Sequence, residues 1–203
     1  MHLILGLDVS TSCVGVCVVD ADKEPDTKGD NVVFMTHIDF KGCETLWDKA
    51  DVVGDSFAKL PSNLTFLQAV KTQSYTMDVC VEEPLMGFRT GMSSAATITT
   101  LMKFNGIVSY LARKVFQTDP IYISAAHARK ECGVKVQRVS KCGVSAKEQV
   151  FEHMRKNDLQ HVNWPSKKKS EKIVDWARDE TDAYVIARAG ALQLRTVPGL
   201  NKP

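Results

Sequence analysis

The chain has 203 residues, of which 44% are hydrophobic and 25% are charged, and its formal net charge is +2. This composition is typical of a globular protein and excludes a disordered chain, a collagen and a coiled coil. No run of 18 apolar residues occurs, which excludes a membrane-spanning helix, and no segment has the pattern of a signal peptide. We therefore expect one domain over residues 1–203, with residues 195–203 as a tail.

The N-terminal half predicts four strands and two helices. Runs of apolar and β-branched residues predict strands at residues 3–9, 14–20, 32–38 and 77–83. Residues 21–31 are rich in Asp, Lys, Pro and Gly and suit a hairpin connection. Helices are expected over residues 44–60 and 63–74, divided by Pro61 and Ser62, and Pro84 ends the fourth strand.

The C-terminal half predicts four helices and one short strand. The helices are expected at residues 94–116, 125–131, 145–157 and 171–194, and the strand at residues 121–124. Ser145, with Glu148 three residues later, has the pattern of a capping box. Residues 132–144 and 159–170 are expected to be loops, of which the second contains three consecutive lysines at 167–169.

Three successive strands followed by alternating strands and helices predict an α/β fold. Such an order gives a mixed five-stranded sheet with helices on both faces. If strand 77–83 runs parallel to strand 3–9, the carboxyl ends of the two strands lie side by side. Open α/β sheets place their functional sites at such ends.

Acidic residues stand at both of these strand ends. Asp8 follows an apolar run, and Glu82 and Glu83 follow another. Because neighbouring strand residues point to opposite faces, only one of the two glutamates can face a site near Asp8. Taken singly, Asp8 could instead be a turn residue, and the two glutamates a charged strand exit.

The last predicted helix carries Asp179 and Asp182 three residues apart, on one face, with Asp175 extending that face. An acidic helix start favoured by the helix dipole is the alternative explanation. With a start near Glu171, however, Asp179 lies about two turns into the helix, where capping is less favourable.

Asp8, Glu82, Asp179 and Asp182 together suggest a metal centre. Carboxylates packed closely raise one another's pKa, and a divalent cation removes that cost. Hard oxygen ligands favour Mg²⁺ or Mn²⁺ over Zn²⁺. Two such ions can activate a water and stabilise the leaving oxygen in phosphodiester cleavage.

The small net charge conceals a strong asymmetry. Residues 101–172 hold 15 Lys and Arg against 6 Asp and Glu, a net charge of +9, whereas residues 1–60 carry a net charge of −6. A basic segment of this kind suits a polyanion such as DNA, and a merely solvated lysine-rich face is the alternative. The six cysteines include no C-x-x-C pair, which favours reduced thiols in a cytoplasm over disulfides or a zinc site.

Three segments in order resemble the motifs of the RuvC-type Holliday junction resolvases, of the RNase H-like superfamily. They are ILGLDVSTSCVG at residues 4–15, VEEP at residues 81–84 and DETDA at residues 179–183. Gly106, Tyr122, Arg129 with Lys130, and the SAKEQV segment at 145–150 also follow the family's order. The resemblance covers nearly the whole chain and implies an RNase H-like fold.

The resemblance also implies an activity and its residues. The family cuts four-way DNA junctions as a homodimer, by paired nicks that leave 5′-phosphate and 3′-hydroxyl ends. By similarity, Asp8, Glu82, Asp179 and Asp182 bind Mg²⁺, for which Mn²⁺ can substitute, and Lys147 is a catalytic basic residue near the scissile phosphate. The residues expected to contact DNA are Phe88, Arg89, Arg129, Lys130, Lys141 and Lys147.

Two departures from the family bear on the substrate. Phe88 is the only aromatic residue in the loop after Glu82, where the family often has one closer to the glutamate. The loop at 132–144 and the lysine cluster at 167–169 look longer than in compact bacterial members. Such additions are found in bacteriophage relatives, whose substrates can include forks and other branched DNA. A bacterial or phage-infected cytoplasm is the expected location.

Three other functions stay open from the sequence alone. An RNase H-like nuclease acting on RNA or on ordinary duplex DNA is the nearest, and cleavage of a four-way junction against a linear duplex separates it. A non-catalytic DNA-binding relative is expected to lack some of the acids, and all four are present. An ATPase or sugar kinase of related fold needs a second lobe, for which 203 residues leave no room.

Overall fold

One mixed sheet of five strands forms the centre of the molecule in the computed structural model. The structure describes residues 1–25, 30–63, 66, 70, 74–84, 94–167, 170 and 172–196. The strands are β1 (His2–Val9), β2 (Cys13–Asp20), β3 (Val32–Asp39), β4 (Thr76–Glu82) and β5 (Ile121–Ile123). Their order in the sheet is β3-β2-β1-β4-β5, antiparallel from β3 to β1 and parallel from β1 to β5. The expected fold class is confirmed.

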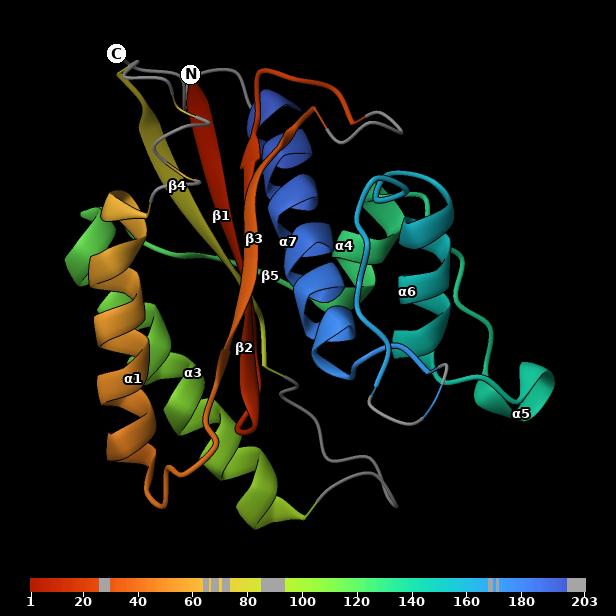
Figure 1. Cartoon of the computed structure of the whole chain (residues 1–203), viewed down its shortest axis with the longest axis horizontal. Helices are drawn as coiled ribbons and strands as arrows, with labels where there is room; N and C mark the ends of the chain where they lie inside the picture. Colours follow the sequence, from red (N-terminus) through yellow and green to blue (C-terminus); the bar gives the residue numbers. More distant parts are fainter. Residues whose placement is uncertain are drawn as a thin grey trace.

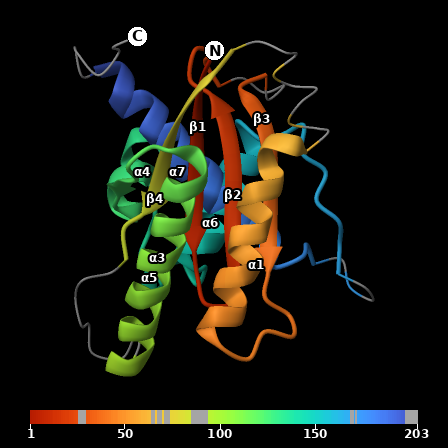
Figure 2. The ribbon, with the colours of Figure 1, turned by 90° about the vertical axis from the view of Figure 1, so that its left-hand side faces the viewer.

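Helices cover both faces of this sheet (Figures 1 and 2). One face carries α1 (Leu46–Lys59) with the short helix η1 (Leu60–Ser62), and α3 (Ala95–Phe116). The other carries α4 (Ala125–Glu131), α6 (Ala146–Lys156) and α7 (Trp176–Thr196). The short helix α5 (Val139–Cys142) stands apart from both layers in Figure 1. Among the described helices, none has the length and apolar character that crossing a membrane requires.

The alternation of side chains along the strands divides the core in two. Odd-numbered Leu3, Leu5 and Leu7 of β1 pack against α1 and α3, whereas Ile4 packs against α7. The same alternation runs through β4, where Val79 and Val81 face α3 and Cys80 faces α7. Asp8 and Glu82 therefore belong to the α7 side of the sheet.

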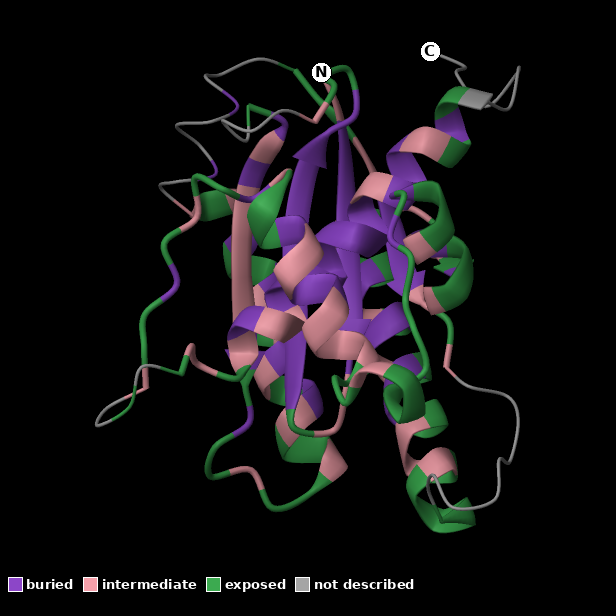
Figure 3. Ribbon diagram, turned by 90° about the vertical axis from the view of Figure 1, so that its right-hand side faces the viewer, coloured by how far each residue is buried: buried purple, intermediate pink, exposed green. Residues whose placement is uncertain are grey.

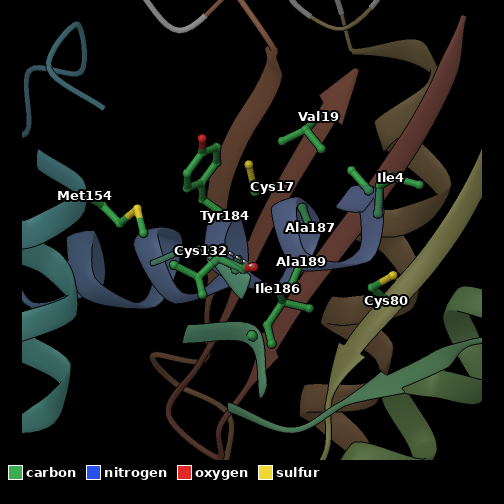
Figure 4. Close-up of a cluster of buried hydrophobic side chains, with 14 of the residues drawn as sticks. Ile4, Cys17, Val19, Cys80, Cys132, Met154, Tyr184, Ile186, Ala187 and Ala189 are labelled. Carbon is green, nitrogen blue, oxygen red and sulfur yellow. Dashed lines mark hydrogen bonds between the residues drawn. The ribbon is translucent and has the colours of Figure 1, made fainter. Parts of the chain in front are cut away.

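Helix α7 is the most buried helix and lies directly on the strands. Figure 3 shows the buried residues gathered in the sheet and in α7, and Figure 4 shows Tyr184, Ile186 and Ala187 among strand residues. The close approach depends on Gly6 of β1, where a Cβ would lie 2.3 Å from the Ala183 carbonyl oxygen. It also depends on Gly15 of β2, where a Cβ would lie 2.0 Å from the Asp179 carbonyl oxygen.

Most predicted element boundaries agree closely with the structure, and four do not, of which the start of the last helix is described separately below. Helix α1 begins at Leu46 and not at residue 44, because Thr45 caps it in a reciprocal capping box with Asp48. Strand β4 ends at Glu82, one residue early. The loop expected at 132–144 contains α5. Most of the helix expected at 63–74 lies outside the described residues, and the single domain over 1–203 stays a prediction.

The predicted start of the last helix near Glu171 is wrong. Ser166 and Ile173 form an antiparallel bridge, and the Lys167 amide donates to the Lys172 carbonyl at 2.7 Å. These extended residues cannot join the helix, which begins at Trp176. Asp179 consequently lies in the first turn, where the helix dipole favours a carboxylate.

Gly6→Ala tests the contact between α7 and the sheet. The added methyl group meets backbone atoms of α7 that cannot move aside without shifting the helix. We expect the free energy of unfolding, measured in urea, to fall by about 2–3 kcal/mol. Gly106→Ala in α3 is the matched control, because nothing lies within 4 Å of its Cβ position. It should raise stability by about 0.5–1 kcal/mol. Equal effects of the two changes would contradict this packing.

Candidate active site

The carboxyl ends of β1 and β4 bring Asp8 and Glu82 together. The parallel register pairs Leu7 with Val81, so the next residues, Asp8 and Glu82, are neighbours on the α7 side. Glu83 points the other way, and its side chain is exposed. Its amide donates to the Ile123 carbonyl at 2.9 Å, which links it to β5. Of the two glutamates, the geometry favours Glu82 as the site residue.

Helix α7 adds Asp179 and Asp182 from its first two turns. Asp8 pairs with Gly15 across the β1–β2 ladder, and Gly15 lies directly beneath the backbone of Asp179. The absence of a side chain at residue 15 thus allows the start of α7 to lie beside Asp8. Asp8 and Asp182 are buried, with 7% of each residue exposed.

Lys147 lies among three of these carboxylates. Its Nζ is 2.6 Å from Asp179 Oδ1, 3.2 Å from Asp8 Oδ2 and 3.4 Å from Asp182 Oδ2. Lys147 occupies the first turn of α6, whose N-cap Ser145 accepts from the Glu148 amide. The sequence associated Lys147 with a phosphate, and the structure places its ammonium group in direct contact with the acids.

A bidentate ion pair holds α6 and α7 in this register. Arg178 donates to Glu148 through Nε (2.5 Å) and Nη2 (3.0 Å), and its guanidinium lies over the Phe151 ring at 4.9 Å. Glu148 and Arg178 are direct neighbours of Lys147 and Asp179, so this pair aligns the lysine with the acids. The capping box predicted for Glu148 is therefore only half formed, because its carboxylate binds Arg178 and no reciprocal cap is made.

The pKa values show that one lysine does not balance the carboxylates. Burial, together with the charge of Asp8, raises the pKa of Glu82 to about 8 and that of Asp182 to about 7. Burial also raises the pKa of Asp8, against the opposing effect of Lys147. Burial alone lowers the pKa of Lys147, but Asp8, Asp182 and Asp179 together hold it above its ordinary value. The cluster as a whole favours additional positive charge.

The donor set fits a hard divalent cation. Four carboxylates from three elements supply oxygen ligands, which Mg²⁺ and Mn²⁺ prefer. In the structure, the Lys147 ammonium group lies between these carboxylates. Among the described residues, no group of three Asp, Glu, His or Cys side chains is already arranged to hold a metal ion. The Lys147 ammonium group and a metal ion would therefore compete for the same carboxylate oxygens of Asp8, Asp179 and Asp182.

Behind the acids, Glu180 joins three aromatic residues in a buried network. Its Oε1 lies 2.9 Å from His37 Nδ1, and its Oε2 accepts from Trp164 Nε1 at 3.1 Å. The His37 ring stacks on Trp176 with centroids 4.3 Å apart. The network connects β3, the 162–166 segment and the first turn of α7, and so fixes the turn that carries Asp179.

Asn105 of α3 supports the end of β4 from the opposite face. It is buried, and its Nδ2 donates to the Glu82 carbonyl at 3.0 Å. Sequence reasoning missed both Asn105 and Glu180 as supporting residues. The available signal was a polar residue within an otherwise apolar helix face, which is costly unless it has a partner.

The residues expected to contact DNA do not lie together in the structure, and two of them are outside the described residues. Arg129 of α4 is near enough to the acids for its charge to oppose the rise in the pKa of Asp8, Glu82 and Asp182 that burial causes. Lys130 and Lys141 are exposed, the latter on α5. Phe88 and Arg89 lie outside the described residues. Asp175 does not extend the acidic face as expected, because it precedes α7 and pairs with Lys167 at 2.7 Å.

Comparison with known proteins identifies the fold. No protein-family model and no curated protein sequence matches the chain. A structure of Thermus thermophilus RuvC in complex with a Holliday junction substrate is similar, with a TM-score of 0.56 and 14% sequence identity over 96% of each chain. A second Thermus thermophilus RuvC structure has a TM-score of 0.54 and 14% identity over 95% of each chain. The chain thus has the RNase H-like fold of RuvC, as its sequence motifs indicate.

Glu180→Ala tests the buried network. It removes the acceptor of two buried or half-buried donors, and we expect the free energy of unfolding to fall by about 3 kcal/mol or more. Glu152→Ala is the matched control, since Glu152 pairs with Arg155 on the surface and should contribute no more than ~1 kcal/mol. Chemical denaturation of both variants measures the difference. Equal losses would show that the network does not hold α7.

Proposed function

We propose that this chain is a metal-dependent, structure-selective endonuclease that resolves four-way DNA junctions, with forks and other branched DNA as further substrates. The observation that carries the proposal is the convergence of Asp8, Asp179 and Asp182 on Lys147, with Glu82 beside Asp8 at the end of β4. It lies at the carboxyl end of the strands, where open sheets place their sites. The RNase H-like fold shared with RuvC supports the same reaction class.

The four carboxylates would hold the divalent cations, two in each site. When bound, Mg²⁺ or Mn²⁺ supplies an activated water and charge stabilisation for the leaving oxygen of a phosphodiester. The raised pKa values of Glu82 and Asp182 favour this occupancy, because bound cations compensate charges that burial disfavours.

Lys147 and Arg129 provide positive charge that belongs to the chain itself. The Lys147 ammonium stands at the centre of the acids, so when it moves aside it remains within reach of a phosphate bound there. It would then orient the scissile phosphate as a compact point charge. Arg129, on the α4 side of the acids, would attract the adjoining backbone phosphates.

Two copies of the chain would be needed for paired nicks. A four-way junction presents two equivalent strands, and a homodimer with twofold symmetry can cut both, leaving 5′-phosphate and 3′-hydroxyl ends. We also propose that the 203-residue chain acts as one domain in a cytoplasm. The six cysteines are free, as expected for a reducing compartment.

A nicking assay tests the function directly. End-labelled four-way junction, fork, linear duplex and RNA–DNA hybrid are incubated with the protein in Mg²⁺, in Mn²⁺ and in EDTA. We expect cation-dependent nicks in the junction, with ends that a ligase can rejoin. Asp8→Asn and Asp182→Asn should abolish cleavage while junction binding in Ca²⁺ stays within a few-fold of the native value. Unchanged cleavage by either variant contradicts the proposed site, and preferential cleavage of the hybrid indicates a ribonuclease.

The adjacent glutamates provide a matched pair within this assay. Glu82→Gln should reduce the single-turnover rate far more than Glu83→Gln, because only Glu82 lies on the α7 side of the sheet. The opposite result would mean that Glu83 carries the ligand and that the register at the end of β4 shifts when substrate binds.

Lys147→Ala separates catalysis from general phosphate binding. We expect the single-turnover rate at saturating enzyme to fall by roughly 10²-fold, about 2.7 kcal/mol of transition-state stabilisation, with only a few-fold loss of junction affinity. Lys156→Ala, on the exposed end of the same helix, is the control and should leave the rate unchanged. Recovery of the rate once binding is saturated would make Lys147 part of the phosphate-binding surface only.

A further inference from the structure

Residues 135–144, here called the α5 arm, project from the molecule immediately before the helix that carries Lys147. Figure 1 shows α5 set apart from the sheet and its helices, toward the end where β1 and β4 finish. Residues 135–141 are all exposed, including Val136 and Val139. The arm leads directly into Ser145, the cap of the helix that carries Lys147. Its position therefore follows from the same helix that builds the site.

One glutamine fastens the arm to α6. The Gln149 Nε2 donates to the carbonyls of Gln137 and Val144, each at 2.9 Å, and lies 3.3 Å from Cys142 Sγ. Its Oε1 accepts from the Gln137 amide at 2.8 Å. A single side chain thus binds the backbone on both sides of α5 and closes the arm into a loop.

The other end of the arm is tied to the core. Val134 is buried among the residues that pack under α4 and α7, and its amide donates to the Arg129 carbonyl at 2.8 Å. Because both ends of the arm are fixed to the rest of the molecule, its exposed middle is held in one conformation. A surface that is already ordered loses little conformational entropy when a ligand binds, which is the arrangement expected of a recognition element.

The arm carries three cations, Lys135, Arg138 and Lys141. None of them has an ion-pair partner among the described residues, whereas Arg155, Lys156 and Lys167 do. An uncompensated cluster of this kind is the charge pattern that attracts a polyanion.

A hollow lies between α4 and the start of the arm. It measures about 350 Å³, and its lining includes Arg129, Lys130 and Lys135 with apolar Val134 and Val136. Arg129 is also the arginine whose charge acts on Asp8, Glu82 and Asp182. Positive charge therefore runs from Arg129 on α4, through Lys130 and Lys135 of the hollow, to the exposed cations of the arm.

We propose that the hollow and the α5 arm bind the phosphate backbone of a second duplex in a branched DNA, beyond the strand being cut. This inference rests on the proposed function. A linear duplex is a stiff rod with a persistence length of about 150 base pairs, so it follows one line across the site. A branched molecule has a second duplex that diverges from that line, and a projecting arm can reach it. The arm thereby favours branched over linear DNA.

Arg129, Lys130 and Lys141 all belong to the basic segment 101–172 and are all expected to contact DNA, but they have different places in the fold. In the structure, Arg129 lines the hollow on α4, near enough to the acids for its charge to act on them, and Lys141 lies on α5 at the far side of the arm. Loss of charge at Arg129 should weaken binding to every DNA, whereas loss of charge on the arm should weaken binding to junctions above all.

The test compares two variants that lose the same charge. K135Q/R138Q/K141Q removes the arm's cations, and K59Q/K103Q/K114Q removes three exposed cations of α1 and α3, on the other face of the sheet. Fluorescence anisotropy in Ca²⁺ measures the Kd for a four-way junction and for a linear duplex of equal length. We expect the arm variant to lose about 10-fold or more in junction affinity and less than 3-fold in duplex affinity, relative to the control. Its salt dependence on the junction should become shallower by about 2–3 in log–log slope.

Gln149→Ala tests whether the arm must be held. It keeps all three cations but removes the bonds to Gln137 and Val144. We expect faster trypsin cleavage after Arg138 and Lys141, and a loss of junction affinity of about 3-fold or more, with the melting temperature confirming a folded protein. Unchanged proteolysis and affinity would overturn the role assigned to Gln149.

The outcomes distinguish the arm from the underlying function. If the native protein cuts junctions and the arm variant binds them like the control, the arm proposal is overturned and the proposed function stands. Equal losses on junction and linear duplex also overturn it, because the arm is then a general phosphate surface. If the native protein neither prefers nor cuts junctions, the proposed function itself fails.

Discussion

The contact between α7 and the backbones of β1 and β2 is the constraint on which the rest of the structure depends. Gly6 and Gly15 are the points of closest approach, and neither has room for a Cβ. Because α7 lies this close, its first turns stand beside Asp8, and two of its acids join two acids from the strands. A helix displaced by a single methyl group would separate these two pairs. The contact that packs the core therefore also sets the geometry of the site.

The close packing of α7 also buries several carboxylates near one another, which is electrostatically unfavourable. The fold stabilises their charges in two ways. Lys147 contributes an ammonium group to Asp8, Asp179 and Asp182, and the Glu148–Arg178 pair keeps its helix in register. Glu180, also buried, is satisfied separately by His37 and Trp164. The pKa values of Glu82 and Asp182 stay raised nonetheless. Raised pKa values of this kind are common in sites whose residues are arranged to bind a ligand and not to stabilise the fold.

The sequence predicted helices and strands well wherever a segment had a single hydrophobic periodicity. The alternation along β1 and β4 also decides between Glu82 and Glu83, although the sequence alone could not say which face held the site. Prediction failed where distant residues intervened. The bridge between Ser166 and Ile173 delays the start of α7, Lys167 draws Asp175 away from the acids, and Arg178 takes the carboxylate that a capping box would have used.

By itself, the sequence determined the order of strands and helices, the four acids and the basic segment, because periodicity and residue type are local properties. It did not determine that Lys147 lies among the acids, that Asn105 and Glu180 support them, or that Gln149 fastens the α5 arm. Those contacts join residues up to 143 positions apart in the chain, as His37 and Glu180 show. Only the packing of α6 and α7 against the sheet brings such residues within hydrogen-bonding distance, so only the tertiary structure could decide them.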